Sequence, residues 1–146
     1  MPDFISLYAQ VQPDKPAVID DRPTGEVLTL SFAELDEASN RLANVFLDLG
    51  VQPGATKVVW CGQNSTGVVV MVSAARKVGV TAVPLNYRLS DEEAAYVTDH
   101  CDATIVYVDA EFAPMFERIR ADIPKVDQVL VYDGPAPAGM ASAGPS

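Results

Sequence analysis

Short apolar runs alternate with helix-length segments through most of the chain, and this alternation constrains the fold more than any other feature. The runs, which have strand length and many β-branched residues, are residues 57–61, 80–83, 104–108 and 126–132. Because more than ten residues separate each run from the next, consecutive strands should be parallel and joined by right-handed crossovers. The predicted fold class is α/β: a three-layer α/β/α sandwich with a largely parallel sheet. The runs that we expect to form central strands are 58–61, 81–83 and 105–107.

Helix starts are marked by residues that can cap them. Ser31 can accept a hydrogen bond from the first turn, and Glu34 follows three residues later, which is the capping-box pattern. Apolar residues then recur at helical spacing, so we expect a helix over 32–49. Similar reasoning predicts helices over 4–9, 90–101 and 111–121.

The segment over 65–78 is ambiguous because its valines favour a strand. Its length favours a helix, Ser65 can cap its start, and Gly79 suits the position beyond its end. We therefore expect a helix that is buried on nearly every side, since it is apolar on nearly every side. The strand that follows is expected to stop at Pro84.

The two ends of the chain differ from its centre. Residues 17–20 and 26–29 flank a turn-rich link, to which we assign Asp20 and Asp21, and this pattern predicts an N-terminal β-hairpin. Residues 134–146 are almost entirely Gly, Pro, Ala and Ser, which bury too little surface to offset their ordering entropy. We expect residues 1–133 to form one folded unit and 134–146 to be a flexible tail or linker.

Charge and apolar content exclude several classes of protein. The 146 residues include 10 Lys and Arg against 20 Asp and Glu, a net charge of −10, so nucleic acid and anionic membranes are not expected partners. The longest apolar run, 68–75, is too short to span a bilayer, so no transmembrane segment is expected. The N-terminus lacks the basic start of a signal peptide, and Cys61 and Cys101 are expected to be buried thiols, so we expect a cytoplasmic location.

Five short motifs, in order and with compatible spacing, carry a resemblance to a known family. Leu30–Leu35 looks like its first core motif, Leu-(Thr/Ser)-Tyr-x-Glu-Leu, with phenylalanine in place of tyrosine. Shorter motifs of the same family match at residues 39–43, 50–54 and 64–65. Residues 77–90 are similar to the family's second core motif in its acyl-CoA ligase form. The chain therefore resembles the N-terminal region of the AMP-forming acyl-CoA synthetase and adenylate-forming (AMP-binding) enzyme superfamily. Departures at residues 55–57 and 66–67 affect only local details of the pattern.

The resemblance implies a reaction for the intact enzyme. It would use ATP and Mg²⁺ to convert a small carboxylic acid, such as a fatty acid or related carboxylate, to an acyl-adenylate, and CoA to form the acyl-CoA. The family's phosphate loop, which ends in Pro-Lys-Gly, would follow the last strand by some tens of residues, and the sequence ends before it. We therefore expect an N-terminal fragment that is inactive alone, binds no cofactor, and has the remainder of the same enzyme as its partner.

No residue of this chain is assigned a catalytic, cofactor-binding or metal-binding role. His100 is the only histidine, and a place beside Cys101 near a helix end is more typical of a half-exposed cap than of a base. Neighbouring helix positions such as 99–102 point in different directions and cannot converge on one metal ion. A phosphate at the helix start near Ser65 would lack a glycine-rich approach and a lysine. Asn86-Tyr87-Arg88, just past a strand, is the best local candidate for lining a ligand cavity, although packing explains it better.

Two further hypotheses compete with that of an acyl-CoA ligase fragment. The chain could be a free-standing α/β module that binds a partner without catalysis, and a stop codon after Ser146 would support it. A flavodoxin-like nucleotide binder is the weaker alternative, because no strand-to-helix turn is rich in glycine.

Overall fold

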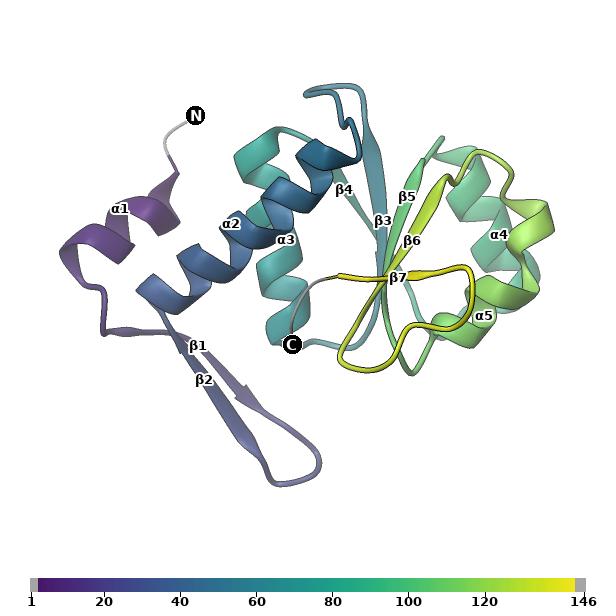
Figure 1. Cartoon of the computed structure of the whole chain (residues 1–146). Coiled ribbons are helices and arrows are strands. Elements are labelled where there is room, and N and C mark those ends of the chain that lie inside the picture. Colours follow the sequence, from purple (N-terminus) through teal and green to yellow (C-terminus); the bar gives the residue numbers. More distant parts are fainter. Residues whose placement is uncertain (1–2, 144–146) are drawn as a thin grey trace.

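A computed structural model describes residues 3–143 and contains a parallel sheet between two layers of helices, preceded by a hairpin (Figure 1). The helices are α1 (Phe4–Val11), α2 (Phe32–Asp48), α3 (Thr66–Val78), α4 (Asp91–His100) and α5 (Ala113–Arg118), with a 3-10 turn at Arg120–Asp122. The strands are β1 (Pro16–Asp21), β2 (Val27–Ser31), β3 (Lys57–Cys61), β4 (Thr81–Leu85), β5 (Ile105–Asp109), β6 (Gln128–Tyr132) and β7 (Ala141–Ser142). Within these residues the sheet order is β4-β3-β5-β6-β7, and β1 pairs with β2 in a separate antiparallel hairpin. The predicted fold class is confirmed.

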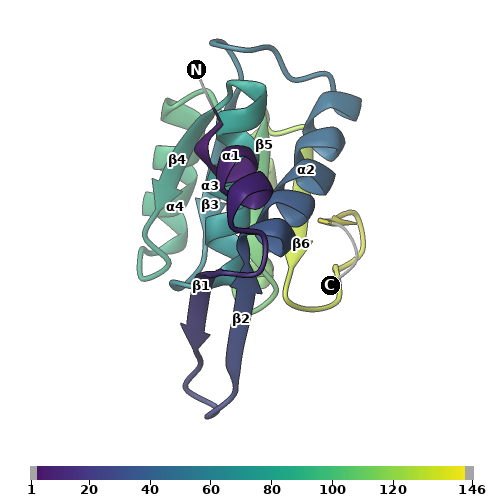
Figure 2. The same ribbon diagram turned by 90° about the vertical axis from the view of Figure 1, so that its left-hand side faces the viewer.

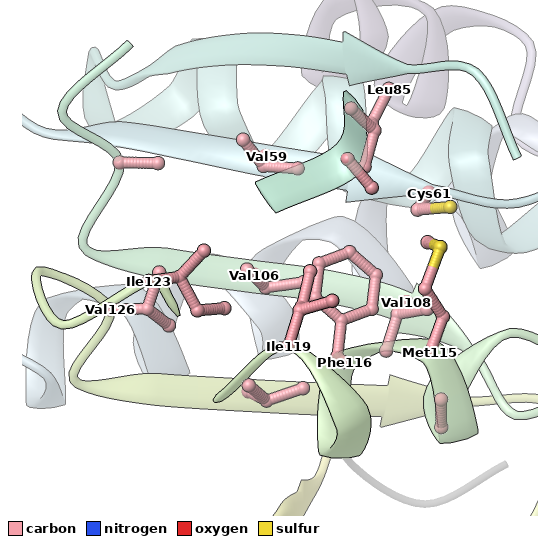
Figure 3. Packing of buried hydrophobic residues seen from close by; sticks show 14 of the residues in the cluster. Val59, Cys61, Leu85, Val106, Val108, Met115, Phe116, Ile119, Ile123 and Val126 are labelled. Carbon is pink, nitrogen blue, oxygen red and sulfur yellow. The ribbon is translucent and has the colours of Figure 1, made fainter. Parts of the chain in front are cut away.

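Side chains of alternate strand residues pack on opposite faces of the sheet. On one face, Phe46 of α2 and Met71 of α3 lie in a cluster with strand residues such as Val58. On the other face, Phe116 of α5 packs in a cluster with Val106 and its neighbours (Figure 3). Burying a side chain of this size stabilises a fold by about 1.5–3 kcal/mol, so these two clusters dominate the stability of the molecule.

The predicted capping box at Ser31 is present, and a second one opens α4. The Glu34 amide donates to Ser31 Oγ at 3.2 Å, and the Ser31 amide donates to the Glu34 carboxylate at 2.7 Å. Ser90 and Glu93 repeat this exchange at the start of α4. Gly79 follows α3 with a positive φ of 73°, a conformation in which a side chain would be strained.

A partly buried lysine joins α1 to the rest of the molecule. Lys77 of α3 donates to Asp36 Oδ1 of α2 at 2.7 Å and to Ser6 Oγ of α1 at 3.0 Å, and it also pairs with Asp3, which caps α1. Burial alone would raise the pKa of Asp36, but the hydrogen bonds from Lys77 and Ser6 and the charge of Lys77 together hold this pKa below its ordinary value. The cluster therefore needs both carboxylates ionised.

The expectation that α3 is buried on nearly every side is wrong. Met71 and Ala74 face the sheet and are fully buried, but Val70 is only partly buried and Val69 is 37% exposed. α3 contacts α2, β1 and β4, and its Lys77 reaches α1, but Val69 and Arg76 remain exposed. The valines at 68, 69, 70 and 72 are only partly buried or exposed, and the buried positions are Met71, Ser73, Ala74, Ala75 and Val78.

Two predictions about β4 are also wrong. The strand does not stop at Pro84 but continues to Leu85, with Pro84 opposite Trp60 of β3. Nor is Thr81–Val83 central, because β4 pairs with β3 alone and forms an edge of the sheet. An edge strand tolerates proline because the missing N–H can face away from the ladder.

Two other boundaries differ from their predicted positions. The helix expected over 111–121 is confined to α5 and a 3-10 turn, because the Glu111 amide donates to Asp109 Oδ1 and holds the preceding residues in a turn. Asp20 and Asp21 lie within β1 rather than in the hairpin turn, and they pair with Leu28 and Val27.

The segment expected to be a flexible tail contains the short strand β7. Ala141 and Ser142 run parallel to Leu130 and Val131 of β6, and the Ala143 amide donates to the Val131 carbonyl at 2.8 Å. Residues 144–146 of that predicted tail lie outside the described residues. The mobility of residues 134–146 stays a prediction.

Candidate functional site

The strand order identifies the crevice in which a sheet of this type holds a ligand. The chain passes from β3 to β4 on one side and then crosses to β5 on the other, so the order reverses between β3 and β5. Ligands of open α/β sheets bind beyond the carboxyl ends of the strands at such a switch point. Here that point lies between the loop after β3, which begins at Gly62, and the loop after β5, which begins at Ala110.

A tyrosine from β6 fills this crevice. A Cβ atom built on Gly62 would lie 2.0 Å from the Tyr132 hydroxyl, and one built on Gly67 would lie 2.4 Å from its ring. The Tyr107 ring stacks on Tyr132 with centroids 4.5 Å apart, and the Tyr107 hydroxyl donates to the Gly67 carbonyl at 3.1 Å. The two glycines therefore admit an aromatic pair to the crevice where a sheet of this type would hold a ligand. The sequence analysis did not select Tyr132, although two glycines flanking a helix start are a signal of close approach.

The start of α3 already holds an anion. The Thr66 amide and hydroxyl both donate to Asp20 Oδ2 of β1, at 2.9 and 3.1 Å, so a carboxylate occupies the positive end of the helix dipole. Ser65, which was predicted to cap the helix, makes no capping bond, and that prediction is wrong. The cap comes from a residue 46 positions away, which no local pattern could reveal.

Acidic side chains surround the crevice. Burial raises the pKa of Asp109, and the nearby Asp133 and Glu111 carboxylates raise it further, although its bond from the Glu111 amide opposes them. Arg22 lies 3.4 Å from Asp20 and 3.0 Å from Asp133, so its charge is already paired. A phosphate at this edge would therefore meet carboxylates rather than a free cation.

Cys61 lies beneath the same edge and is buried. Burial and the Asp109 carboxylate raise the pKa of the Cys61 thiol to about 12. A thiol that stays protonated is a poor nucleophile. The expectation of a buried thiol is confirmed for Cys61, whereas Cys101 is only partly buried.

Asn86-Tyr87-Arg88 forms a turn that packs on the fold. Asn86 Oδ1 accepts a hydrogen bond from the Arg88 amide at 3.0 Å, the Tyr87 ring lies 5.0 Å from that of Phe112, and the Arg88 guanidinium lies 5.5 Å from the centre of the Tyr87 ring. The turn follows the edge strand β4, away from the switch point. These contacts favour a packing role over the lining of a ligand cavity.

The acidic and histidine residues near the end of α4 serve a surface network. Lys125 donates to Asp102 Oδ1 at 2.9 Å and lies 3.4 Å from Asp99, while the His100 ring stacks on Tyr96. Across residues 3–143, no three His, Cys, Asp or Glu side chains gather closely enough to hold a metal ion. Over the same residues, no helix combines the length and apolar character needed to cross a membrane.

A cavity of about 490 Å³, here called the hairpin pocket, lies between the hairpin, α2, the start of α3 and the end of β6. Leu28 and Leu30 of β2 form one wall, and Leu42 of α2 and Val70 of α3 form another. Tyr132 separates this pocket from the filled crevice, because its ring lines the pocket while its hydroxyl points at Gly62. None of the sequence candidates lines it.

Comparisons with known proteins agree with this architecture. The AMP-binding enzyme family profile matches residues 6–145. A crotonobetaine/carnitine–CoA ligase from Salmonella paratyphi B is 34% identical over 114 residues, which make up 78% of this chain and 22% of that protein. A 3-hydroxybenzoate–CoA ligase from Aromatoleum sp. is 31% identical over 133 residues, 91% of this chain and 24% of that protein.

Among solved structures, a fatty acyl CoA synthetase from Mycobacterium tuberculosis superposes with a TM-score of 0.78 and 28% identity. The superposition covers 88% of this chain and 26% of that one. The chain therefore spans between 22% and 26% of the length of these three proteins. Because the family profile matches nearly the whole sequence, the chain belongs to the AMP-binding enzyme family.

Proposed function

We propose that this chain is the N-terminal part of an AMP-forming acyl-CoA ligase, in which it forms structural support for the adenylation site rather than the site itself. The intact enzyme would convert a carboxylic acid to an acyl-adenylate with ATP and then transfer the acyl group to CoA. The family profile carries this proposal, together with relatives that are named as CoA ligases and are about four times as long.

The residues at the switch point support the limited role of this part. An adenylylation transition state needs cations and amide donors around the phosphates. The described crevice instead contains Tyr132, the carboxylates of Asp109 and Asp133, and an arginine, Arg22, that is already paired. These residues do not fit ATP with Mg²⁺, so no catalytic step is assigned to them. Catalytic groups would come from the polypeptide that follows.

The first experiment measures the exchange of labelled pyrophosphate into ATP by purified residues 1–146, with Mg²⁺ and a panel of aliphatic and aromatic acids. We expect no exchange above a control without enzyme, and ATP binding no tighter than about millimolar, which corresponds to about 4 kcal/mol. Exchange that is lost in Arg22→Ala or Arg88→Ala would show that these residues do form a catalytic site.

The second experiment extends the reading frame beyond Ser146 and assays the longer protein. We expect carboxylate-dependent exchange of pyrophosphate and CoA-dependent release of AMP. A natural stop codon after Ser146 would contradict the proposal and favour a non-catalytic binding module.

A further inference from the structure

The hairpin pocket is a largely apolar recess beside the hairpin, which Asp20 and Arg22 tie to the start of α3 and the end of β6. β1 and β2 extend away from the sheet, as both views show (Figures 1 and 2). Side chains alternate along them: Leu28 and Leu30 line the pocket, whereas Ile19 on the opposite face is 69% exposed. A two-stranded hairpin is only marginally stable by itself, so these contacts, and any further contact made within the pocket, hold it in place.

The polar groups of the pocket do not converge on a ligand. Arg22 pairs with Asp133 at 3.0 Å, Arg41 pairs with Glu37 at 2.6 Å, and the Tyr107 hydroxyl donates to the Gly67 carbonyl. A small-molecule site needs a few polar groups aimed at a common point. Since these charges and hydroxyls are already engaged within the chain, an apolar occupant fits the pocket better than a charged metabolite.

The chain itself reaches the rim of this pocket. Gly134, Ser142 and Ala143 line it, and the hydrogen bond from the Ala143 amide to Val131 holds the described end of the chain against the sheet there. The matched region makes up only 22–24% of the two relatives. Outside that region, before or after it, they therefore contain further polypeptide about three times as long as this chain. A polypeptide that continued from this point would emerge at the mouth of the pocket.

We propose that the hairpin pocket is a docking surface for the polypeptide that follows Ser146 in the longer protein. An apolar segment of that polypeptide packs against Leu28, Leu30 and Val70, and it fixes the hairpin relative to α2 and α3. This inference rests on the proposed function, because both require the chain to continue.

Hydrogen exchange of residues 1–146 alone and of the longer protein tests this docking. We expect amides of residues 27–31 and 66–71 to exchange about tenfold more slowly in the longer protein, because local opening would then have to break the added contacts. Amides of α4, which lies across the sheet from the pocket, should exchange equally in both.

A matched pair of variants supplies the second readout. Leu28→Ser should lower the melting temperature of the longer protein by more than it lowers that of residues 1–146, because it removes a contact that only the longer protein makes. Leu47→Ser is the control, since Leu47 is 53% exposed on α2 and does not line this pocket, and it should have the same small effect in both proteins.

The outcomes separate this inference from the proposed function. Equal exchange at residues 27–31 in both proteins, or equal effects of Leu28→Ser, would overturn the docking surface even if the longer protein forms acyl-adenylate. If the amides of residues 27–31 were protected in the longer protein but that protein did not exchange pyrophosphate into ATP, the docking surface would stand and the proposed ligase activity would be rejected.

Discussion

At the scale of single residues, ion pairs between distant parts of the chain replace interactions that local patterns predict. Asp20, rather than Ser65, caps α3, and its carboxylate also lies 3.4 Å from Arg22. Arg22 in turn reaches Asp133 at the end of β6. Asp20 and Arg22 thus join the hairpin to the start of α3 and to the end of β6.

Replacing Asp20 with alanine should therefore destabilise the fold by about 1 kcal/mol, the usual cost of removing a helix cap. The measurement is urea unfolding followed by circular dichroism, with Asp21→Ala as the control, because Asp21 is adjacent, exposed and on the opposite face of β1. Ser65→Ala should change stability less than Asp20→Ala does. The reverse order of these two variants would restore Ser65 as the cap.

Lys77 makes the acid stability of the fold depend on Asp3 and Asp36. Burial would raise both carboxyl pKa values, but the hydrogen bonds from Lys77 and Ser6 and the charge of Lys77 together lower them from the ordinary value of 3.8. A lowered pKa in the folded state means that the unfolded state takes up protons first as the pH falls. The stability that the pair contributes is present above about pH 4 and is lost as the pH falls through the lowered values.

We expect Lys77→Met to cost about 1–3 kcal/mol at pH 7, because it leaves two partly buried carboxylates without their cation. The difference from the wild type should shrink as the pH is lowered below the ordinary carboxyl range, where both carboxylates become protonated. Arg41→Met is the control, since the exposed pair of Arg41 with Glu37 is worth only about 0.3–0.5 kcal/mol. A loss in Lys77→Met that does not change with pH would contradict this electrostatic account.

At the scale of elements, the sequence specifies what is local and leaves open what is not. Capping boxes such as Ser31 with Glu34, and the positive φ of Gly79, depend on residues within one turn and were predicted correctly. The edge position of β4 depends on which strand lies beside β3, and the filling of the crevice depends on Tyr132 crossing over β5. These features result from tertiary packing, so they cannot be predicted from the sequence of any one short segment.

The two faces of α3 give an element-scale prediction. Ala74→Asp should unfold the protein, because an unpaired carboxylate in the dry space beneath the helix costs several kcal/mol against a total stability of about 5–15 kcal/mol. Val69→Asp on the exposed side should leave the fold intact. Thermal unfolding of both variants tests this difference, and a folded Ala74→Asp variant would contradict the packing of α3 on the sheet.

At the scale of the whole molecule, stability should decrease from the centre of the sheet outward. We expect the slowest hydrogen exchange in β3 and β5, which have a partner on both sides, and faster exchange in the edge strand β4. Amides over 134–140 should exchange almost freely, whereas the Ala143 amide, which bonds to Val131, should be slower. Strong protection across residues 138–142 would contradict a flexible tail.

The proline in β4 has a consequence for how copies of this molecule meet. An exposed edge strand can recruit a strand from another molecule and so begin an aggregate. Pro84 leaves β4 one N–H donor short, so the ladder cannot be extended regularly on that side. At the opposite edge, β7 covers β6 only at Leu130 and Val131 within the described residues. Strand exchange between molecules, if the protein is concentrated or partly unfolded, is therefore directed to the β6 side.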